Sequence, residues 1–408
     1  MARERLGRDY RFLWGAATIS AVGDGVVFSA LPLLAVTLTR KPALVAGVTV
    51  AAGLPWLLFA LIAGALVDRW DRRRVMASAD GFRMAVFAVL GAAVLTHHAG
   101  LWLVYVCGFL AGTAQTLFDN AAQAILPQIV PRGTLESANA RMFASQVVNE
   151  QLAGPPLGSF LFVASPSVPF LADAASFGGS ALLLLGVRPN PGVDRRERRS
   201  LRIEIVEGLR WLRGHRLLRA MAIMLGTWNL VVTAGMSVLV LYAIEVLHIG
   251  KRGYGVLLAV AAAGGLIGTA VASRLARRFG AAATMLSMLF IGAATESMFV
   301  FFPRLPVIVP AMILESASGV VWNVITVSLR QTIIPERLLG RVNSVYRFIA
   351  WGTMPIGGIA GGILARTFGL RAPYAMAAAT TLFMGIVGRI WVHARAIDAA
   401  RSVAEPND

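Results

Sequence analysis

Long apolar stretches recur along the whole chain, and they limit the folds it can adopt more than any other feature. A helix of roughly 17–25 apolar residues crosses the hydrocarbon core of a bilayer, which is about 30 Å thick. Hydrophobic residues occupy 57% of the 408 positions and charged residues only 14%, a composition outside the range of water-soluble proteins. We therefore predict an all-α membrane protein. Twelve transmembrane helices are expected near residues 12–38, 44–67, 75–96, 101–122, 139–163, 167–187, 219–246, 253–273, 281–302, 305–327, 343–365 and 372–393.

Positive charge is concentrated in alternate loops between these stretches. The sequence has 38 basic and 21 acidic residues. Most of the basic residues are arginines in segments 3–11, 69–74, 188–219, 274–278 and 330–341. Because basic loops stay on the cytoplasmic side of a membrane, both termini and residues 188–218 are expected to be cytoplasmic, in the cell (inner or plasma) membrane. The charge follows topology, so no nucleic-acid partner is expected.

The two halves of the chain resemble each other. An offset of 204 residues carries Gly64 onto Gly268 and Asn139 onto Asn343, and such matches fall in corresponding loops and spans. This pattern favours two six-helix pseudo-repeats in the same orientation. We expect an N-terminal half at residues 1–187, a cytoplasmic linker with an amphipathic helix at 188–218, a C-terminal half at 219–393 and a cytoplasmic tail at 394–408.

The stretch GALVDRWDRRRVM, residues 64–76, resembles the signature of the loop between helices two and three of the major facilitator superfamily. The chain also resembles the twelve-span drug exporters related to macrolide efflux proteins and the enterobactin exporter. This second resemblance is carried by SAVGDGVVFSALPLL, by FDNAAQAILPQIVPRGTLESANA and by GPPLG in the fifth span. Together they imply the major facilitator fold and export by alternating access. Asp71 departs from the superfamily pattern, which has glycine at this position.

The resemblance to the superfamily implies that the loop after the second span latches the cytoplasmic side shut while the substrate site faces outward. Gly64 allows close helix packing, and Asp68 is placed to pair with a neighbouring arginine. Asp80 and Arg83, three residues apart, are expected to form an ion pair that braces the gate. The alternative is that these charges only set topology. The predicted gate residues are Gly64, Asp68, Arg69, Arg72, Arg73, Asp80 and Arg83.

Acidic residues inside the spans are candidates for proton or substrate coupling, because a charge at mid-membrane is costly and is normally paired or functional. Asp24 and Glu150 are the strongest, with Gln146 one turn from Glu150 and with Asp119 near a span end. Asp24 is alternatively a structural hydrogen-bond acceptor or a contact for a cationic substrate. Asp173, near the outer end of its span, is expected to be hydrated. Glu296 and Glu315 also lie inside spans, and the sequence does not rank them.

Two further groups of residues complete the predicted machinery. Proline and small residues in GPPLG and in GTMPIGGIAGGI are expected to control helix packing, the alternative being a tolerated kink. Aromatic residues at equivalent places in the two halves are candidates to line a substrate cavity, the alternative being that they face lipid or pack inside the protein. The packing residues are Gly154, Pro155, Gly158, Gly358 and Gly362, and the cavity residues are Phe118, Trp322 and Asn323.

Motifs of enzymes are missing from the sequence. It has no phosphate-binding loop, nucleophile elbow or metal-ligand spacing, so no enzymatic activity, cofactor or metal is expected. A secondary transporter remains, and the resemblance implies proton-coupled export of bulky amphiphiles such as drugs, macrolide-like compounds or siderophores. The alternatives are a lysophospholipid or lipid flippase, an uptake symporter of the same fold, and a membrane sensor or enzyme. The expected partners are a small-molecule substrate, protons and the lipid bilayer, and the chain is expected to be a monomer.

Overall fold

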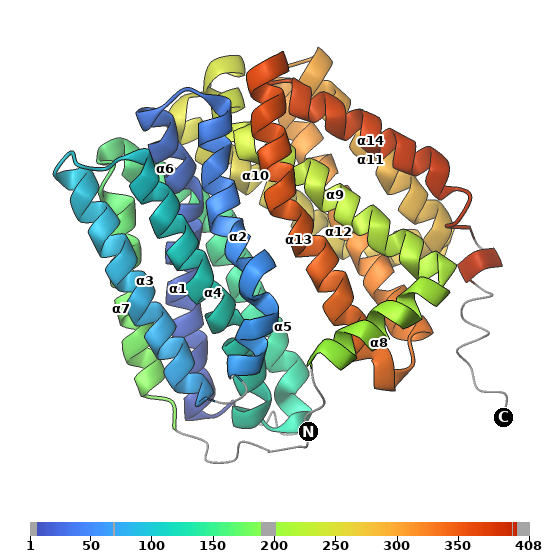
Figure 1. The fold of residues 1–408 in the computed structure, drawn as a ribbon, viewed down its shortest axis with the longest axis horizontal. Coiled ribbons are helices and arrows are strands. Elements are labelled where there is room, and N and C mark those ends of the chain that lie inside the picture. Colours follow the sequence, from blue (N-terminus) through green and yellow to red (C-terminus); the bar gives the residue numbers. More distant parts are fainter. Residues whose placement is uncertain (1–5, 68–69, 189–200, 394, 398–408) are drawn as a thin grey trace. The chain divides into compact units, whose positions relative to one another are not determined.

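The computed structural model describes residues 6–67, 70–188, 201–393 and 395–397. Within these ranges the regular elements are helices (Figure 1). The chain divides into two compact units. Unit 1 comprises Met1–Arg198 and Ile249–Ala259, and unit 2 comprises Arg199–His248 and Val260–Asp408.

In unit 1, α1 and α3 each contact two or more other helices, and α2 packs against α4. Its elements are α1 (Arg8–Leu38), α2 (Pro42–Val67), α3 (Arg72–Leu95), α4 (Leu101–Ile129), η1 (Arg132–Thr134), α5 (Leu135–Gln146), η2 (Val147–Ala153), α6 (Gly154–Ala164) and α7 (Val168–Leu185). The first turns of α10 (Gly250–Phe279) belong to the same unit. Helix α3 packs against α4 and α7, and α1 packs against α6 and α7.

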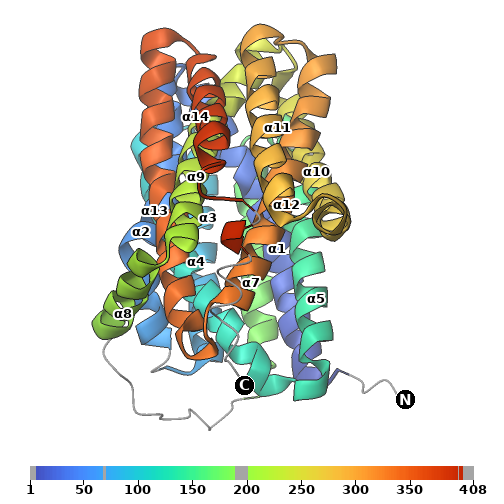
Figure 2. The ribbon, with the colours of Figure 1, turned by 90° about the vertical axis from the view of Figure 1, so that its right-hand side faces the viewer.

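Unit 2 begins with α8, which packs against α13 (Figure 2). Its elements are α8 (Leu201–Gly214), α9 (Arg216–Leu241), η3 (Tyr242–Val246), the rest of α10, α11 (Ala281–Phe301), α12 (Leu305–Ile333), α13 (Glu336–Phe368) and α14 (Ala372–Gly388). Helix α11 packs against α12 and α14, and α9 packs against α13.

Many of these helices are long and apolar enough to cross a membrane. Among the described residues, ten satisfy both conditions. Helix α14 is apolar but has only 17 residues, and α5, η2 and α6 follow one another without a break over residues 135–164. This is the architecture of a multi-pass, all-α membrane protein.

The fifth apolar stretch widens into a π-helix directly before two prolines. Pro155 and Pro156 lack the N–H groups that would bond to carbonyls four residues earlier. Ahead of them lies η2, Val147–Ala153, and the N–H of Gly154 bonds to the carbonyl of Asn149, five residues back. The GPPLG motif therefore changes the helix geometry over two turns. Such π segments are frequent at functional sites.

Each unit has its own hydrophobic core. In unit 1 the core includes Met76 and Leu126, and in unit 2 it includes Met221 and Tyr346. Lipid tails are as apolar as leucine, so close packing rather than exclusion from water holds such helices together.

Candidate functional site

Arg83, on α3, is a charged side chain buried inside unit 1. It is 1% exposed and donates hydrogen bonds to Asp80 on the same helix and to Gln115 on α4. Its guanidinium carbon lies 4.0 Å from the ring centroid of Phe177 on α7 and 4.8 Å from that of Phe118 on α4. Guanidinium groups are attracted to aromatic faces. One arginine therefore ties α3, α4 and α7 together.

Asp80 is the fully buried partner of this arginine. Its side chain is 0% exposed, and its Oδ2 accepts a hydrogen bond of 2.5 Å from Ser180 Oγ on α7. The predicted ion pair between Asp80 and Arg83 is thus present, and it connects α3 to α7. Its action as a gate stays a prediction.

Asp24, on α1, is the second carboxylate partner of Arg83. Its Oδ1 lies 3.3 Å from Arg83 Nη1, and its side chain is 25% exposed, against 0% for Asp80. Ser20 Oγ, one turn earlier, donates to Asp24 Oδ2 at 3.4 Å. Asp24 is therefore the more accessible of the two carboxylates that pair with Arg83.

Glu150 lies in the π-helical segment next to α1. Gln146 Nε2 donates to Glu150 Oε2 at 2.9 Å, so these two residues, one turn apart in the sequence, are in direct contact. A Cβ atom on Gly25 would lie only 2.4 Å from the carbonyl oxygen of Glu150, which means that α1 touches the π-helix beside Asp24. The charges of Asp24 and Glu150 are close enough to act on each other.

Asp119, on α4, joins the network through an amide. Gln115 Nε2 donates to Asp119 Oδ1 at 3.0 Å, while Gln115 Oε1 accepts from Arg83. The charge of Asp119 acts on Arg83 and on Glu150. Asp119 therefore acts on Glu150 directly and is connected to Asp24 through Arg83.

The expectation that Asp173 is hydrated is wrong. It is 1% exposed, its Oδ1 accepts from Ser176 Oγ at 3.1 Å, and its Oδ2 is buried without a partner among the described residues. A Cβ atom on Gly23 of α1 would lie 2.0 Å from Asp173 Oδ1. The glycine lets α1 and α7 approach so closely that water is excluded, which distance from the span end does not predict.

The predicted latch is described only in part. Asp68 and Arg69 lie outside the described residues, and so do the side-chain surroundings of Gly64. Arg72 Nη1 donates to a backbone carbonyl near the end of α4 at 2.9 Å. Arg73 Nη1 donates at 2.8 Å to a carbonyl just beyond the end of α7, where a cation is favourable. These two arginines thus tie the start of α3 to neighbouring helix ends.

Asp71 has a local role that explains its departure from the superfamily pattern. It is the N-cap of α3, and its side chain accepts hydrogen bonds from the backbone N–H groups of Arg73 at 3.0 Å and Arg74 at 3.4 Å. Aspartate is among the best residues at an N-cap. Aspartate in place of glycine at position 71 therefore provides an acceptor for two backbone N–H groups in the first turn of α3.

Predicted packing glycines in the fifth span do make close contacts. A Cβ on Gly154 would lie 2.5 Å from Gly25 Cα, and one on Gly158 would lie 2.2 Å from the carbonyl oxygen of Val26. The carbonyl of Pro155 accepts a hydrogen bond of 2.9 Å from Ser29 Oγ on α1. The first turns of α10 also contact this segment, since a Cβ on Gly255 would lie 2.4 Å from the carbonyl oxygen of Pro155.

In α13, two glycines next to the predicted pair make close contacts. A Cβ on Gly357 or on Gly361 would lie 2.2 Å from a carbonyl oxygen of α9. Gly358 and Gly362 are buried beside them. Gly357 and Gly361 have the same four-residue spacing as the predicted pair and add a direct contact with α9 to this segment.

The aromatic residues predicted to line a cavity are packed in the cores. Phe118 and Trp322 are each 6% exposed, Phe118 against Arg83 and Trp322 in the core of unit 2. Asn323 is exposed. In this structure, therefore, Phe118 serves the arginine network rather than an open surface.

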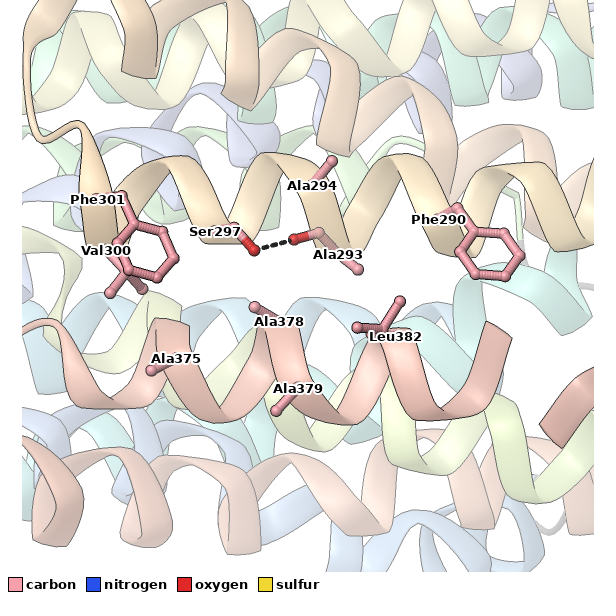
Figure 3. Close-up of a pocket in the computed structure, with 10 residues that line it drawn as sticks. All are labelled: Phe290, Ala293, Ala294, Ser297, Val300, Phe301, Ala375, Ala378, Ala379 and Leu382. Carbon is pink, nitrogen blue, oxygen red and sulfur yellow. Dashed lines mark hydrogen bonds between the residues drawn. The ribbon is translucent and has the colours of Figure 1, made fainter. Parts of the chain in front are cut away.

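A groove of about 430 Å³ lies between α11 and α14 of unit 2, whereas the charged network lies in unit 1. Figure 3 shows the side chains that line the groove. It is lined by Phe290, Ala293, Ala294, Ser297, Val300, Phe301, Ala375, Ala378, Ala379 and Leu382. The hydroxyl of Ser297 bonds to the carbonyl of Ala293 at 2.7 Å. None of these lining residues has an ionisable side chain.

The residues that stabilise the buried ion pair of Arg83 and Asp80 were not predicted from the sequence. Gln115, Ser180 and Phe177 each touch the ion-pair network. The only available signal was their occurrence as polar or aromatic residues within apolar spans, which many uninvolved residues share.

Comparisons with known proteins agree with this architecture. The profile of the family described as "Transmembrane secretion effector" matches residues 7–407. The multidrug efflux pump Tap of Mycolicibacterium fortuitum is 28% identical over 403 residues, which are 94% of this chain and 96% of that protein. Tap of Mycobacterium tuberculosis (strain ATCC 25618 / H37Rv) is 27% identical over 388 residues, 91% of this chain and 90% of that protein.

A solved structure supports the fold. A bacterial homologue of the iron transporter ferroportin, in an inward-facing state, superposes with a TM-score of 0.76 at 18% identity, covering 95% of this chain and 100% of that one. At this identity the likeness concerns the fold alone. The family match spans nearly the whole chain and includes the charged network. The chain therefore belongs to the Transmembrane secretion effector family of major facilitator superfamily transporters.

Proposed function

We propose that this transporter exports bulky amphiphilic small molecules in exchange for protons, by alternating access. The observation that carries the proposal is the Asp24–Arg83–Asp80 network, in which one buried cation has a fully buried partner and a partly exposed one. The relatives named as multidrug efflux pumps support the substrate class and the export direction.

The proton step assigned to this network is local. When Asp24 is ionised, it shares the charge of Arg83 with Asp80. When Asp24 takes up a proton, it stays within reach of Ser20, and Arg83 keeps Asp80 and Gln115. The helix α1 that carries Asp24 is then held less strongly to α3. A change of partner of this kind favours one of two conformations, as coupling requires.

The architecture that we propose for this cycle has twelve spans. The ten helices found by length and hydropathy are joined by α14 and by the continuous segment 135–164, which has enough residues to cross the bilayer once its π-helical part is included. Two six-helix halves, at 1–187 and 219–393, then flank the linker at 188–218. The distribution of arginines supports cytoplasmic termini in the plasma membrane, and we propose that the transporter acts as a monomer.

The latch is assigned to the loop between α2 and α3. Arg72 and Arg73 already bind neighbouring helix ends, and we assign to Asp68 the contact that is made in only one of the two conformations. The loop then holds the cytoplasmic side closed in that conformation.

Transport in inverted membrane vesicles tests the proposal. With a panel of amphiphilic drugs as substrates, an imposed pH gradient, acidic inside, should drive accumulation in vesicles that contain the protein and not in control vesicles. Drug accumulation that does not depend on the pH gradient would refute proton coupling. Movement of lysophospholipid without movement of drugs would identify a flippase instead, and uptake in right-side-out vesicles would identify a symporter.

A further inference from the structure

Unit 2 contains a buried carboxyl group whose oxygens are unsatisfied. Glu296, on α11, is 1% exposed, and both of its Oε atoms are buried without a hydrogen-bond partner among the described residues. Thr381, on α14, is 0% exposed, and its Oγ1 is likewise without a partner. The two side chains face each other across the α11–α14 contact but do not form a hydrogen bond of normal geometry.

A second acid faces the same place from a third helix. Glu315, on α12, is half-buried, and its charge acts on Glu296. In the described part of the chain, no basic side chain acts on either carboxyl group. The basic residue at the end of α14, Arg389, is 4.9 Å from the ring centroid of Phe290. The pair therefore differs from the acids of unit 1, which surround Arg83.

The tryptophan of α9 closes the space beside these acids. A Cβ atom on Gly292, one turn before Glu296, would lie 2.9 Å from the ring of Trp228, and one on Gly319, one turn after Glu315, would lie 3.5 Å from it. Helices α9, α11, α12 and α14 thus surround the pair with an indole ring, glycines and Thr381.

Two ionised carboxylates are not stable in such surroundings. Burial without pairing strongly disfavours a charge, and a neighbouring like charge adds to the cost. The neutral acid, in contrast, has an O–H donor that Thr381 Oγ1 or Glu315 accepts after a small rotation. We propose that Glu296 and Glu315 form a proton-binding site in unit 2, in which Glu296 holds the proton and half-buried Glu315 exchanges it with water.

The site has a clear place in the transport cycle. It adds a second titrating group, in the unit that lacks the Asp24 network, so that each unit contributes one proton. This use rests on the proposed proton-coupled export, whereas the binding of a proton by Glu296 does not.

Infrared difference spectroscopy of the purified protein in lipid nanodiscs at neutral pH tests the site directly. Comparison of wild type with Glu296→Gln should show the loss of a C=O band of a protonated carboxyl group. Loss of a carboxylate band instead would overturn the proposal. The matched control is Glu207→Gln, which should remove a carboxylate band because Glu207 Oε2 lies 2.6 Å from Arg341 Nη1.

A second variant covers the case in which Glu296→Gln does not fold. Glu315→Gln should keep the protonated-acid band but shift its frequency, since the neighbour of Glu296 changes. An unchanged band would show that the two acids do not form one site. Proton-driven transport in proteoliposomes then separates the two proposals. If the Glu296 band is present but a proton gradient drives no transport, the proton-binding site is retained and the proposed function is refuted.

Discussion

Replacing Arg83 by methionine should destabilise unit 1 strongly. Asp80 is 0% exposed and would keep only its hydrogen bond from Ser180. Removing one partner of a buried ion pair costs about 3–5 kcal/mol, because the remaining charge is uncompensated. This corresponds to a change of more than about a hundredfold in the equilibrium between folded and unfolded protein.

Thermal unfolding of the purified protein in detergent measures this loss. The double variant Arg83→Met, Asp80→Asn should recover most of the stability, because it removes both charges together. The control is Arg74→Met. The Arg74 side chain is 79% exposed, and its Nε lies 3.8 Å from Asp71 Oδ2. Loss of such an exposed ion pair should lower the free energy of unfolding by about 0–1 kcal/mol. If Arg83→Met were as stable as this control, or if the second substitution gave no recovery, the network would not be a buried ion pair.

Three further predictions concern topology, packing and the latch. An impermeant thiol reagent added to intact cells should label a cysteine placed at Ala99 and not one placed at Ser200, with Cys107 replaced by serine; the reverse labelling would invert the topology. Gly158→Ala should reduce transport by pushing α6 from α1, because its Cβ would lie 2.2 Å from a backbone oxygen where ordinary contact begins at 3.4 Å, and overpacking of this kind costs about 1–3 kcal/mol. Asp68→Asn should impair transport without loss of folding and increase labelling of cytoplasmic-side cysteines, whereas full transport with unchanged labelling would leave its charge a role in topology only.

A matched control exists for the packing variant. Gly133→Ala places a Cβ where no atom lies within 4 Å, so it should transport like wild type. If Gly158→Ala were equally active, the close contact between α1 and α6 would be dispensable.

The membrane character and the positions of the helices could be predicted from the sequence, because hydropathy is a property of each segment by itself. Local pairs were also predictable: Asp80 with Arg83, and Gln146 with Glu150, lie three and four residues apart on one helix face. Such spacing brings side chains together wherever the helix packs.

Contacts between helices could not be predicted, because they depend on how two helices are rotated and shifted. The bond from Ser180 to Asp80 joins residues 100 positions apart. Burial of Asp173 depends on Gly23 of another helix. The effect of proline was equally context-dependent: Pro355 is accommodated inside a continuous α13, whereas the pair at Pro155 and Pro156 follows a π-helix.

Asp24→Asn in proteoliposomes tests whether Asp24 couples proton movement to drug transport. Drug transport driven by an imposed pH gradient is compared with counterflow exchange of drug in the absence of a gradient, and Glu136→Gln, at an exposed position of α5, is the control. Our account predicts that the variant loses the pH-driven component and retains exchange, because the neutral amide can still hydrogen-bond but cannot carry a proton. Intact pH-driven transport in Asp24→Asn would contradict this account and transfer the coupling role to Glu150.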